Sequence, residues 1–288
     1  MVRAFLVLFL AVRATAAANL WDEVSGDRAL QHVNYLVDLG PRPAGSAALE
    51  KSRAYIEKEL RANGWEVTRQ TFTDSTPRGP VTYVNLIARF GKKPSPSFLL
   101  CSHYDTKIFD TFTFVGANDG GSSTGLLLEM GRVLALHPQL AVKVELAFFD
   151  GEEAVEEFST TDGIYGSRHF ANSLRESNEK FRGGILFDMV GDRDLKITLP
   201  LDSPRDMAQH IFAAADALKV RDHFTYFSGD VTDDHSPLNA AGVPTIDLID
   251  FDYPAWHTAG DKIDKVSAES LQTVGKVAAY YLSEFALK

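Results

Sequence analysis

The chain has 288 residues, of which 45% are hydrophobic and 24% are charged. This composition is typical of a globular protein, and it excludes a disordered, a collagen-like or a polytopic membrane protein. The 29 Lys and Arg residues against 39 Asp and Glu residues give a net charge of -10, which would repel the phosphates of a nucleic acid. We therefore expect no nucleic-acid partner. We also expect one domain, because a large α/β sheet can include a chain of this length.

The first 18 residues have the pattern of a secretory signal peptide. Arg3 precedes an apolar run at residues 4–12, and small residues follow at 15–18. An N-terminal membrane anchor is the alternative, but this run is about half of the ~20 residues that cross a bilayer. We therefore expect cleavage near Ala18, export to the periplasm or the medium, no stable membrane insertion and a mature domain at residues 19–288.

Cys101 is the only cysteine, so no disulfide can form within the chain. It follows three apolar residues at 98–100, which favours a small buried hydrophobic side chain over a reactive thiol. We assign Cys101 no chemistry, and we expect the hydrophobic core to stabilise the fold without a disulfide.

Hydrophobic periodicity predicts the elements in chain order. Leu30, Val33 and Leu36 recur at helical spacing, whereas Val, Thr, Tyr and Ile alternate at strand spacing in residues 81–90. Asn63-Gly64 is a helix-ending signal. Helices are expected at residues 26–39, 47–62, 121–136, 164–176, 204–218 and 267–286, and strands at residues 65–72, 81–90, 97–101, 142–149, 184–190 and 244–249.

The order of these elements predicts the fold class. The first two strands follow one another directly, which is compatible with an antiparallel start to the sheet. From residue 97 onward, apolar strands alternate with helices, and this rhythm is typical of parallel strands that are buried on both faces. We therefore predict a single-domain α/β/α sandwich around a central mixed, mostly parallel sheet.

Acidic and histidine residues cluster where the predicted strands end. In an open α/β sheet, ligands bind beyond the carboxyl ends of the strands, so these residues would meet at one site. Several carboxylates so close together would repel one another unless a cation or protons neutralised them. The residues in question are His103, Asp105, Asp119, Asp150, Glu152, Glu153, Asp188 and His257.

A divalent metal would neutralise this cluster, and mixed imidazole and carboxylate ligands suit zinc better than magnesium or calcium. Three protein ligands with one open position would make the zinc catalytic. Each residue also has a structural explanation of its own. Asp105 and Asp119 could form turns or helix caps, and Glu152 with Glu153 could be a solvated pair.

Five short motifs in a fixed order identify a family. The chain resembles the glutaminyl cyclases of the zinc aminopeptidase superfamily, from about residue 30 to the C-terminus. The histidine, aspartate and paired-glutamate motifs alone are shared with the dizinc aminopeptidases, whereas the later motifs favour the cyclases. The motifs are His103-Tyr104-Asp105-Thr106-Lys107, Phe148-Phe149-Asp150-Gly151-Glu152-Glu153-Ala154, Tyr165-Gly166-Ser167-Arg168-His169, Asp233-Asp234-His235-Ser236-Pro237 and Trp256-His257-Thr258.

The resemblance implies roles for individual residues. One zinc ion per chain would be bound by Asp119, Glu153 and His257. Glu152 matches the catalytic acid/base, and Asp188 and Asp233 match its proton network. Trp256 matches the aromatic wall of the substrate pocket, to which we expect Phe158 to contribute, and we expect His169 and His235 to be hydrogen-bonded structural supports.

The sequence departs from the family pattern at three places. The loop at residues 118–123 is more similar to the aminopeptidase version than to the version in animal cyclases. Phe158 stands where animal cyclases carry a tryptophan, and Asp247 stands where they carry a histidine. Animal cyclases also have a disulfide near the site, which a chain with one cysteine cannot form.

The resemblance implies conversion of N-terminal glutamine of peptides or proteins to pyroglutamate. The α-amine attacks the γ-carboxamide carbon and ammonia leaves, with zinc polarising the carbonyl and Glu152 moving the proton. A dizinc aminopeptidase is the alternative enzyme, with His103 and Asp188 binding a second zinc. A non-catalytic peptide-binding domain is a third reading, because fold alone does not imply activity. We expect a monomer.

Overall fold

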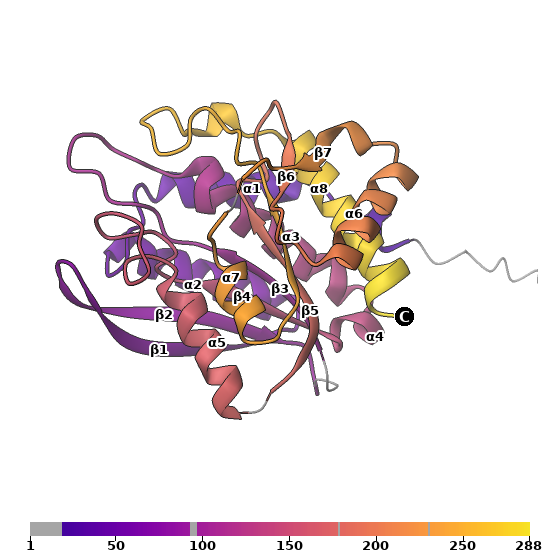
Figure 1. Ribbon diagram of the computed structural model, residues 1–288, viewed down its shortest axis with the longest axis horizontal. Helices are drawn as coiled ribbons and strands as arrows, with labels where there is room; N and C mark the ends of the chain where they lie inside the picture. Colours follow the sequence, from indigo (N-terminus) through magenta and orange to yellow (C-terminus); the bar gives the residue numbers. More distant parts are fainter. Residues whose placement is uncertain (1–18, 93–96, 178, 230) are drawn as a thin grey trace, which may run out of the picture.

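The computed structural model describes residues 19–92, 97–177, 179–229 and 231–288 (Figure 1). The predicted signal peptide at residues 1–18 lies outside the described residues. The α-helices are α1 (Gly26–Asp38), α2 (Ala47–Ala62), α3 (Ser123–Ala135), α4 (Pro138–Ala141), α5 (Tyr165–Ser177), α6 (Arg205–Ala217), α7 (His235–Ala240) and α8 (Ala268–Tyr281). The strands are β1 (Glu66–Thr76), β2 (Gly79–Arg89), β3 (Ser97–His103), β4 (Val144–Phe149), β5 (Phe181–Asp188), β6 (Ile197–Leu199), β7 (Phe224–Tyr226) and β8 (Thr245–Ile249).

Six of these strands form one sheet in the order β1-β2-β4-β3-β5-β8. β1 pairs with β2, and β2 with β4, in antiparallel orientation, whereas β4, β3, β5 and β8 are mutually parallel. The predicted antiparallel start and the mostly parallel sheet are therefore both confirmed. β6 and β7 form a separate two-stranded parallel ribbon.

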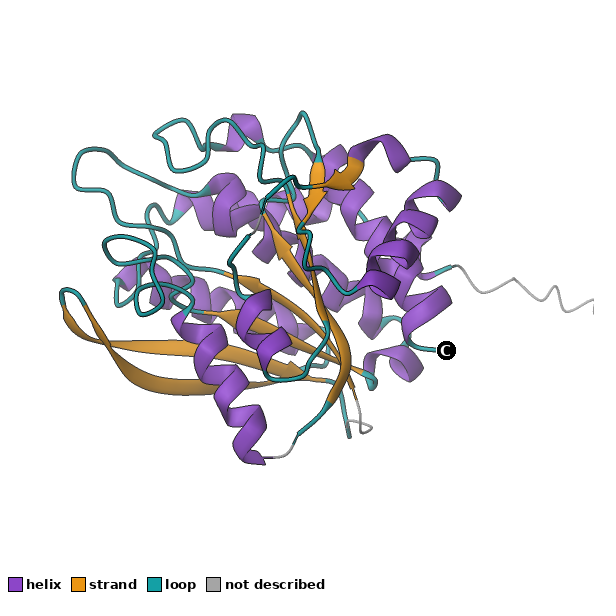
Figure 2. Ribbon diagram, viewed as in Figure 1, coloured by secondary structure: helices purple, strands orange, loops and turns teal. Residues whose placement is uncertain are grey.

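Helices cover both faces of the sheet (Figures 1 and 2). Successive side chains of a strand point to opposite faces, so Leu100 packs in the larger core with α1, α3 and α8. Leu99 and Cys101 pack in a smaller core under α5 and α7. Cys101 is fully buried, as predicted. The α/β/α sandwich is confirmed.

The longer predicted elements agree with the structure within a few residues. β1 continues to Thr76, beyond the predicted end at residue 72, because its hairpin with β2 extends past the apolar alternation. β6, β7, α4 and α7 were not predicted from the sequence. Strands of three residues and helices of four and six are too short to show a period.

Local capping fixes the ends of three of the helices. The side chains of Ser25, Ser46 and Ser267 each accept a hydrogen bond from a backbone N–H in the first turn of α1, α2 and α8, respectively. Within the described part of the chain, none of the helices combines the length and the apolar character that crossing a bilayer requires.

Candidate active site

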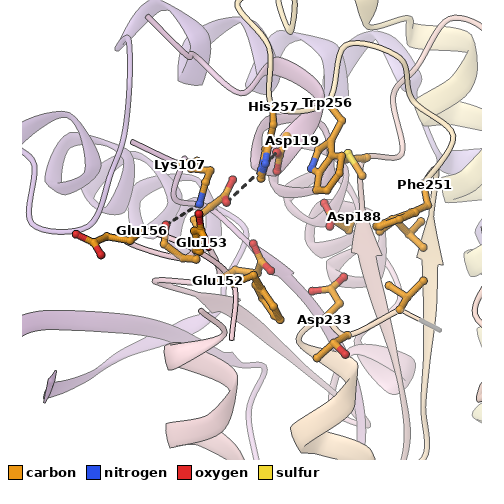
Figure 3. A pocket seen from close by; sticks show the side chains of 17 residues that line it. Lys107, Asp119, Glu152, Glu153, Glu156, Asp188, Asp233, Phe251, Trp256 and His257 are labelled. Carbon is orange, nitrogen blue, oxygen red and sulfur yellow. Dashed lines mark hydrogen bonds and ion pairs between the residues drawn. The ribbon is translucent and has the colours of Figure 1, made fainter. Parts of the chain in front are cut away.

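A pocket with a cavity volume of about 500 Å³ opens at the carboxyl ends of the parallel strands (Figure 3). β5 ends at Asp188, and the segment after β4 carries Glu152 and Glu153. The pocket is lined by eight residues that the sequence analysis selected as site residues: Asp119, Glu152, Glu153, Phe158, Asp188, Asp233, Trp256 and His257.

Asp119, Glu153 and His257 form a group on the pocket wall, which we call the pocket triad. His257 Nε2 lies 3.4 Å from Asp119 Oδ2 and 3.3 Å from Glu153 Oε2. Asp119 Oδ2 and Glu153 Oε1 are buried and have no hydrogen-bond partner. Such orphaned acceptors around one imidazole have the chemistry of a metal site, and the ligand atoms lie within 4.8 Å of one another.

The charges of the pocket triad also favour a cation. Burial and the neighbouring Asp119 carboxylate raise the pKa of Glu153 to about 7. Burial lowers the pKa of the His257 imidazole, but the adjacent Asp119 and Glu153 carboxylates outweigh it and raise the pKa to about 10. Each group is thus stabilised in the form that reduces the local negative charge.

A second group, the inner triad, consists of His103, Asp119 and Asp188 and shares Asp119 with the first. His103 Nε2 lies 3.3 Å from both Asp119 Oδ1 and Asp188 Oδ1, and His103 Nδ1 lies 3.5 Å from Asp105 Oδ1. His103 is buried and does not line the pocket. Burial lowers its pKa, but the nearby carboxylates, Asp188 foremost, raise it well above its ordinary value.

Glu152 projects into the pocket beside both triads (Figure 3). Burial raises its pKa well above the ordinary value for a glutamate. The His103 imidazole opposes this shift, whereas the carboxylates of Glu153 and Asp233 add to it. A carboxyl group with a raised pKa can both accept and return a proton near neutral pH.

Asp105 fixes the turn that carries the two glutamates. Its carboxylate accepts hydrogen bonds from the backbone N–H groups of Glu152 at 3.2 Å and Glu153 at 3.3 Å. Gly151 in the same turn has a φ of +69°, a conformation that favours glycine. From the sequence, Asp105 was expected in the cluster, with a turn or a helix cap as its structural alternative.

The loop of Asp119 is held from behind by Asp261. Asp261 Oδ1 accepts from the backbone N–H of Asn118 at 2.8 Å, and Oδ2 accepts from that of Asp119 at 3.1 Å. Tyr253 donates its hydroxyl to Asp261 Oδ1 at 2.9 Å. Gly120 has a φ of +74°, and a Cβ there would lie 2.6 Å from the carbonyl oxygen of Asp105, so a larger residue would displace the loop.

Buried Arg42 anchors the start of the same loop. Its guanidinium donates hydrogen bonds to the carbonyl oxygens of Leu36, Val115 and Gly116. Burial lowers the pKa of Arg42 to about 10. Arg42 and Asp261 were not selected from the sequence, and the signal for Arg42 was an arginine between two prolines.

Two residues of the pocket have left-handed backbone conformations. The φ angles of Met189 and His257 are +46° and +52°. Left-handed φ angles are uncommon for residues with a Cβ, and such strain concentrates at functional sites. The conformation of Met189 ends β5 directly after Asp188, and that of His257 sets the direction of the imidazole.

Aromatic side chains form the outer wall of the pocket. Trp256 and Phe158 are 41% and 47% exposed, so they are not core aromatic residues. The Trp256 ring stacks on His257 at a centroid distance of 4.4 Å and lies 5.4 Å from Phe251, which the sequence analysis did not select. These rings provide an apolar surface for a substrate side chain.

Behind the pocket, Asp233 belongs to a third buried group with His235 and Asp247. His235 Nδ1 lies 3.3 Å from Asp247 Oδ2. Burial and the nearby Asp247 carboxylate raise the pKa of Asp233 well above its ordinary value. His169 lies apart from this group, stacked on Phe72 at 4.0 Å.

Comparisons with known proteins agree on the family. Residues 85–282 match peptidase family M28. A glutaminyl-peptide cyclotransferase-like protein of Bos taurus is 30% identical over 280 residues, which are 85% of this chain and 72% of that protein. A glutaminyl cyclase structure from an Acidobacteriales bacterium has a TM-score of 0.85 and 33% identity over 96% of this chain and 98% of that one. A Zn-dependent exopeptidase of Parabacteroides distasonis has a TM-score of 0.83 and 25% identity over 93% and 100% of the two chains.

Proposed function

Because the chain belongs to peptidase family M28, and within it to the glutaminyl-peptide cyclotransferases, we propose that it converts N-terminal glutamine of peptides or proteins to pyroglutamate with release of ammonia. The observation that carries this proposal is one pocket that places Glu152 beside the pocket triad and under an aromatic wall. This arrangement combines a proton carrier, a set of metal ligands and an apolar surface.

Different residues of the pocket have different roles in the proposed cyclisation. The glutamine methylenes lie against Trp256, which excludes water from the reacting atoms. Glu152 accepts the proton of the α-amine as nitrogen bonds to the γ-carboxamide carbon, and returns it to the departing nitrogen as ammonia leaves. Asp188 and Asp233 line the same pocket, and the Asp233 carboxylate helps to keep the pKa of Glu152 raised.

The metal belongs to the pocket triad in this proposal. Asp119, Glu153 and His257 would hold one zinc ion, which when bound supplies a Lewis acid that polarises a carbonyl group. Support comes from the orphaned oxygens of Asp119 and Glu153 and from their access to the pocket. His103 Nε2 lies between the Asp119 and Asp188 carboxylates, and a protonated imidazole there would neutralise them without a second metal.

The test incubates purified protein with a peptide that begins with glutamine. Cyclisation removes NH3, so the peptide loses about 17 Da and free ammonia is released in equal amount. An otherwise identical peptide that begins with leucine distinguishes the aminopeptidase alternative. Release of free leucine, with two tightly held metals per chain, would reverse the assignment.

We also propose that residues 1–18 direct export and that residues 19–288 act as a monomeric single domain. This proposal is supported by the basic, apolar and small-residue order of the N-terminal segment. The mass of the protein recovered from the periplasm or the medium tests the cleavage site, and sedimentation tests the monomer. A secreted protein that still carries residues 1–18 would contradict the signal-peptide assignment.

A further inference from the structure

A second hollow adjoins the pocket and shares part of its wall. Its cavity volume is about 510 Å³, and Lys107, Glu156 and Glu157 line both cavities. In Figure 3, Lys107 and Glu156 lie on the side of the pocket away from Phe251 and Asp233. A chain that leaves the pocket on this side therefore enters the second hollow.

Three segments that are distant in sequence form the walls of this hollow. They are the β1–β2 turn at Pro77 and Arg78, the segment at residues 107–109 and the loop at residues 155–162. Figure 1 shows the hairpin tip and these loops on the same side of the molecule. The hollow is thus a groove between loops rather than a gap within the core.

Side-chain contacts tie the three walls to one another. Arg78 Nη2 lies 3.4 Å from Asp110 Oδ2, and Arg78 Nε lies 3.6 Å from Glu156 Oε1. Lys107 Nζ donates a hydrogen bond to the carbonyl oxygen of Ala154 at 2.8 Å. These contacts link the hairpin tip, the segment after β3 and the loop after β4.

The floor of the groove is held in one conformation by Asp162. Its carboxylate accepts hydrogen bonds from the backbone N–H groups of Val155 at 2.7 Å and Glu156 at 2.9 Å. The Tyr165 hydroxyl donates to Asp162 Oδ1 at 2.9 Å. A groove that is ordered before binding loses less conformational entropy when a ligand enters.

The lining suits an extended peptide. Ile108, which is 37% exposed, offers an apolar contact, and Ser159 and Thr161 offer polar ones. An extended chain advances about 3.3 Å per residue, so three residues span about 10 Å. We propose that residues two to four of the substrate bind in this groove, and that the enzyme therefore prefers peptides of several residues over glutamine dipeptides. This inference rests on the proposed function and on the continuity of the two cavities.

The experiment compares Gln-Leu amide with Gln-Leu-Ala-Leu-Ala amide, which carry the same charge. For the wild-type enzyme, we expect kcat/KM to be at least about tenfold higher for the longer peptide. Ile108→Ser should lower kcat/KM for the longer peptide roughly fivefold, because the contact of one or two methylene-sized groups is lost. The same variant should lower kcat/KM for the dipeptide amide much less, because only the second residue of that substrate reaches the groove.

Leu136→Ser is the matched control, since Leu136 is 54% exposed at the end of α3, about 20 Å along that helix from the site. Leu136→Ser should leave kcat/KM unchanged for both substrates. Equal kcat/KM for the two substrates in the wild-type enzyme, or an equal loss for both in Ile108→Ser, would overturn the groove assignment while leaving the proposed function intact. Failure to cyclise either peptide would instead overturn the proposed function and the groove with it.

Discussion

The two triads share Asp119 but differ in their access to the pocket. The His257 side chain is 26% exposed, and all three members of the pocket triad line the cavity. The His103 side chain is only 1% exposed, and both of its ring nitrogens face carboxylates. All three side chains of the first arrangement thus reach the cavity, whereas in the second only Asp119 and Asp188 do.

This difference between the triads bears on the choice between cyclisation with one zinc ion and hydrolysis with two. Dizinc hydrolysis would need a metal in each triad and a water between them. In this chain, three carboxylates, those of Asp105, Asp119 and Asp188, surround His103 and favour a fixed imidazolium. In the one-zinc arrangement that we propose, a buried imidazolium takes the place of the second metal, and the pocket triad is the metal position.

Metal removal should have the largest effect. Exhaustive chelation should abolish cyclisation, because both the polarising ion and the neutralising charge are lost. Activity should return fully at one equivalent of zinc per chain, measured by titration with metal analysis. A requirement for two equivalents would show that the inner triad also binds a metal, and full activity after chelation would refute the metal assignment.

Glu152→Gln comes next, with an expected fall in kcat of about 10² to 10⁴, because an amide cannot carry the proton. Zinc content should stay at one per chain, since Glu152 is outside the pocket triad. Glu176→Gln is the matched control, because Glu176 is exposed on α5 and lines neither cavity. Unchanged turnover in Glu152→Gln would remove it as the proton carrier.

The two histidines allow a direct comparison of the triads. His257→Ala should lower zinc affinity about 100-fold or more, measured by competition with a chelator. His103→Ala should keep one zinc per chain but lower the free energy of unfolding by about 3–5 kcal/mol, because it leaves buried carboxylates without their cation. A variant at His103 that loses zinc, or one at His257 that retains it fully, would reverse the roles of the two triads.

Sequence reasoning predicted the fold well because its long elements have clear periods. Eight of the residues that line the pocket were also selected from the sequence, since strand ends in a parallel sheet meet at one edge. Residue types alone did not separate the two triads, and the separate ligand sets came from the family resemblance. Both consist of the same residue types at strand ends, and only side-chain burial distinguishes His103 from His257.

The residues that sequence reasoning missed act through backbone contacts between distant segments. Asp261 is an isolated acidic residue in a polar loop, and its partners at residues 118 and 119 are more than 140 positions away. Arg42 binds carbonyl oxygens, which leave no signal in residue type. Such roles depend on where the folded chain places its N–H and C=O groups.

Asp261→Asn should give the smallest of the effects predicted here. Asp261 holds the loop of Asp119, the ligand that both triads share, and an asparagine NH2 group would face a backbone N–H that now finds an acceptor. We expect zinc affinity to fall about 10-fold, as is typical when the hydrogen bonds that support a metal ligand are removed.

Asp264→Asn is the control, because the Asp264 side chain is 67% exposed. If only the pocket triad binds metal, the fall should appear as one weakened site per chain in calorimetric titration. Two weakened sites would show that the inner triad accepts a metal as well, and an unchanged affinity would show that the Asp119 loop keeps its position without Asp261.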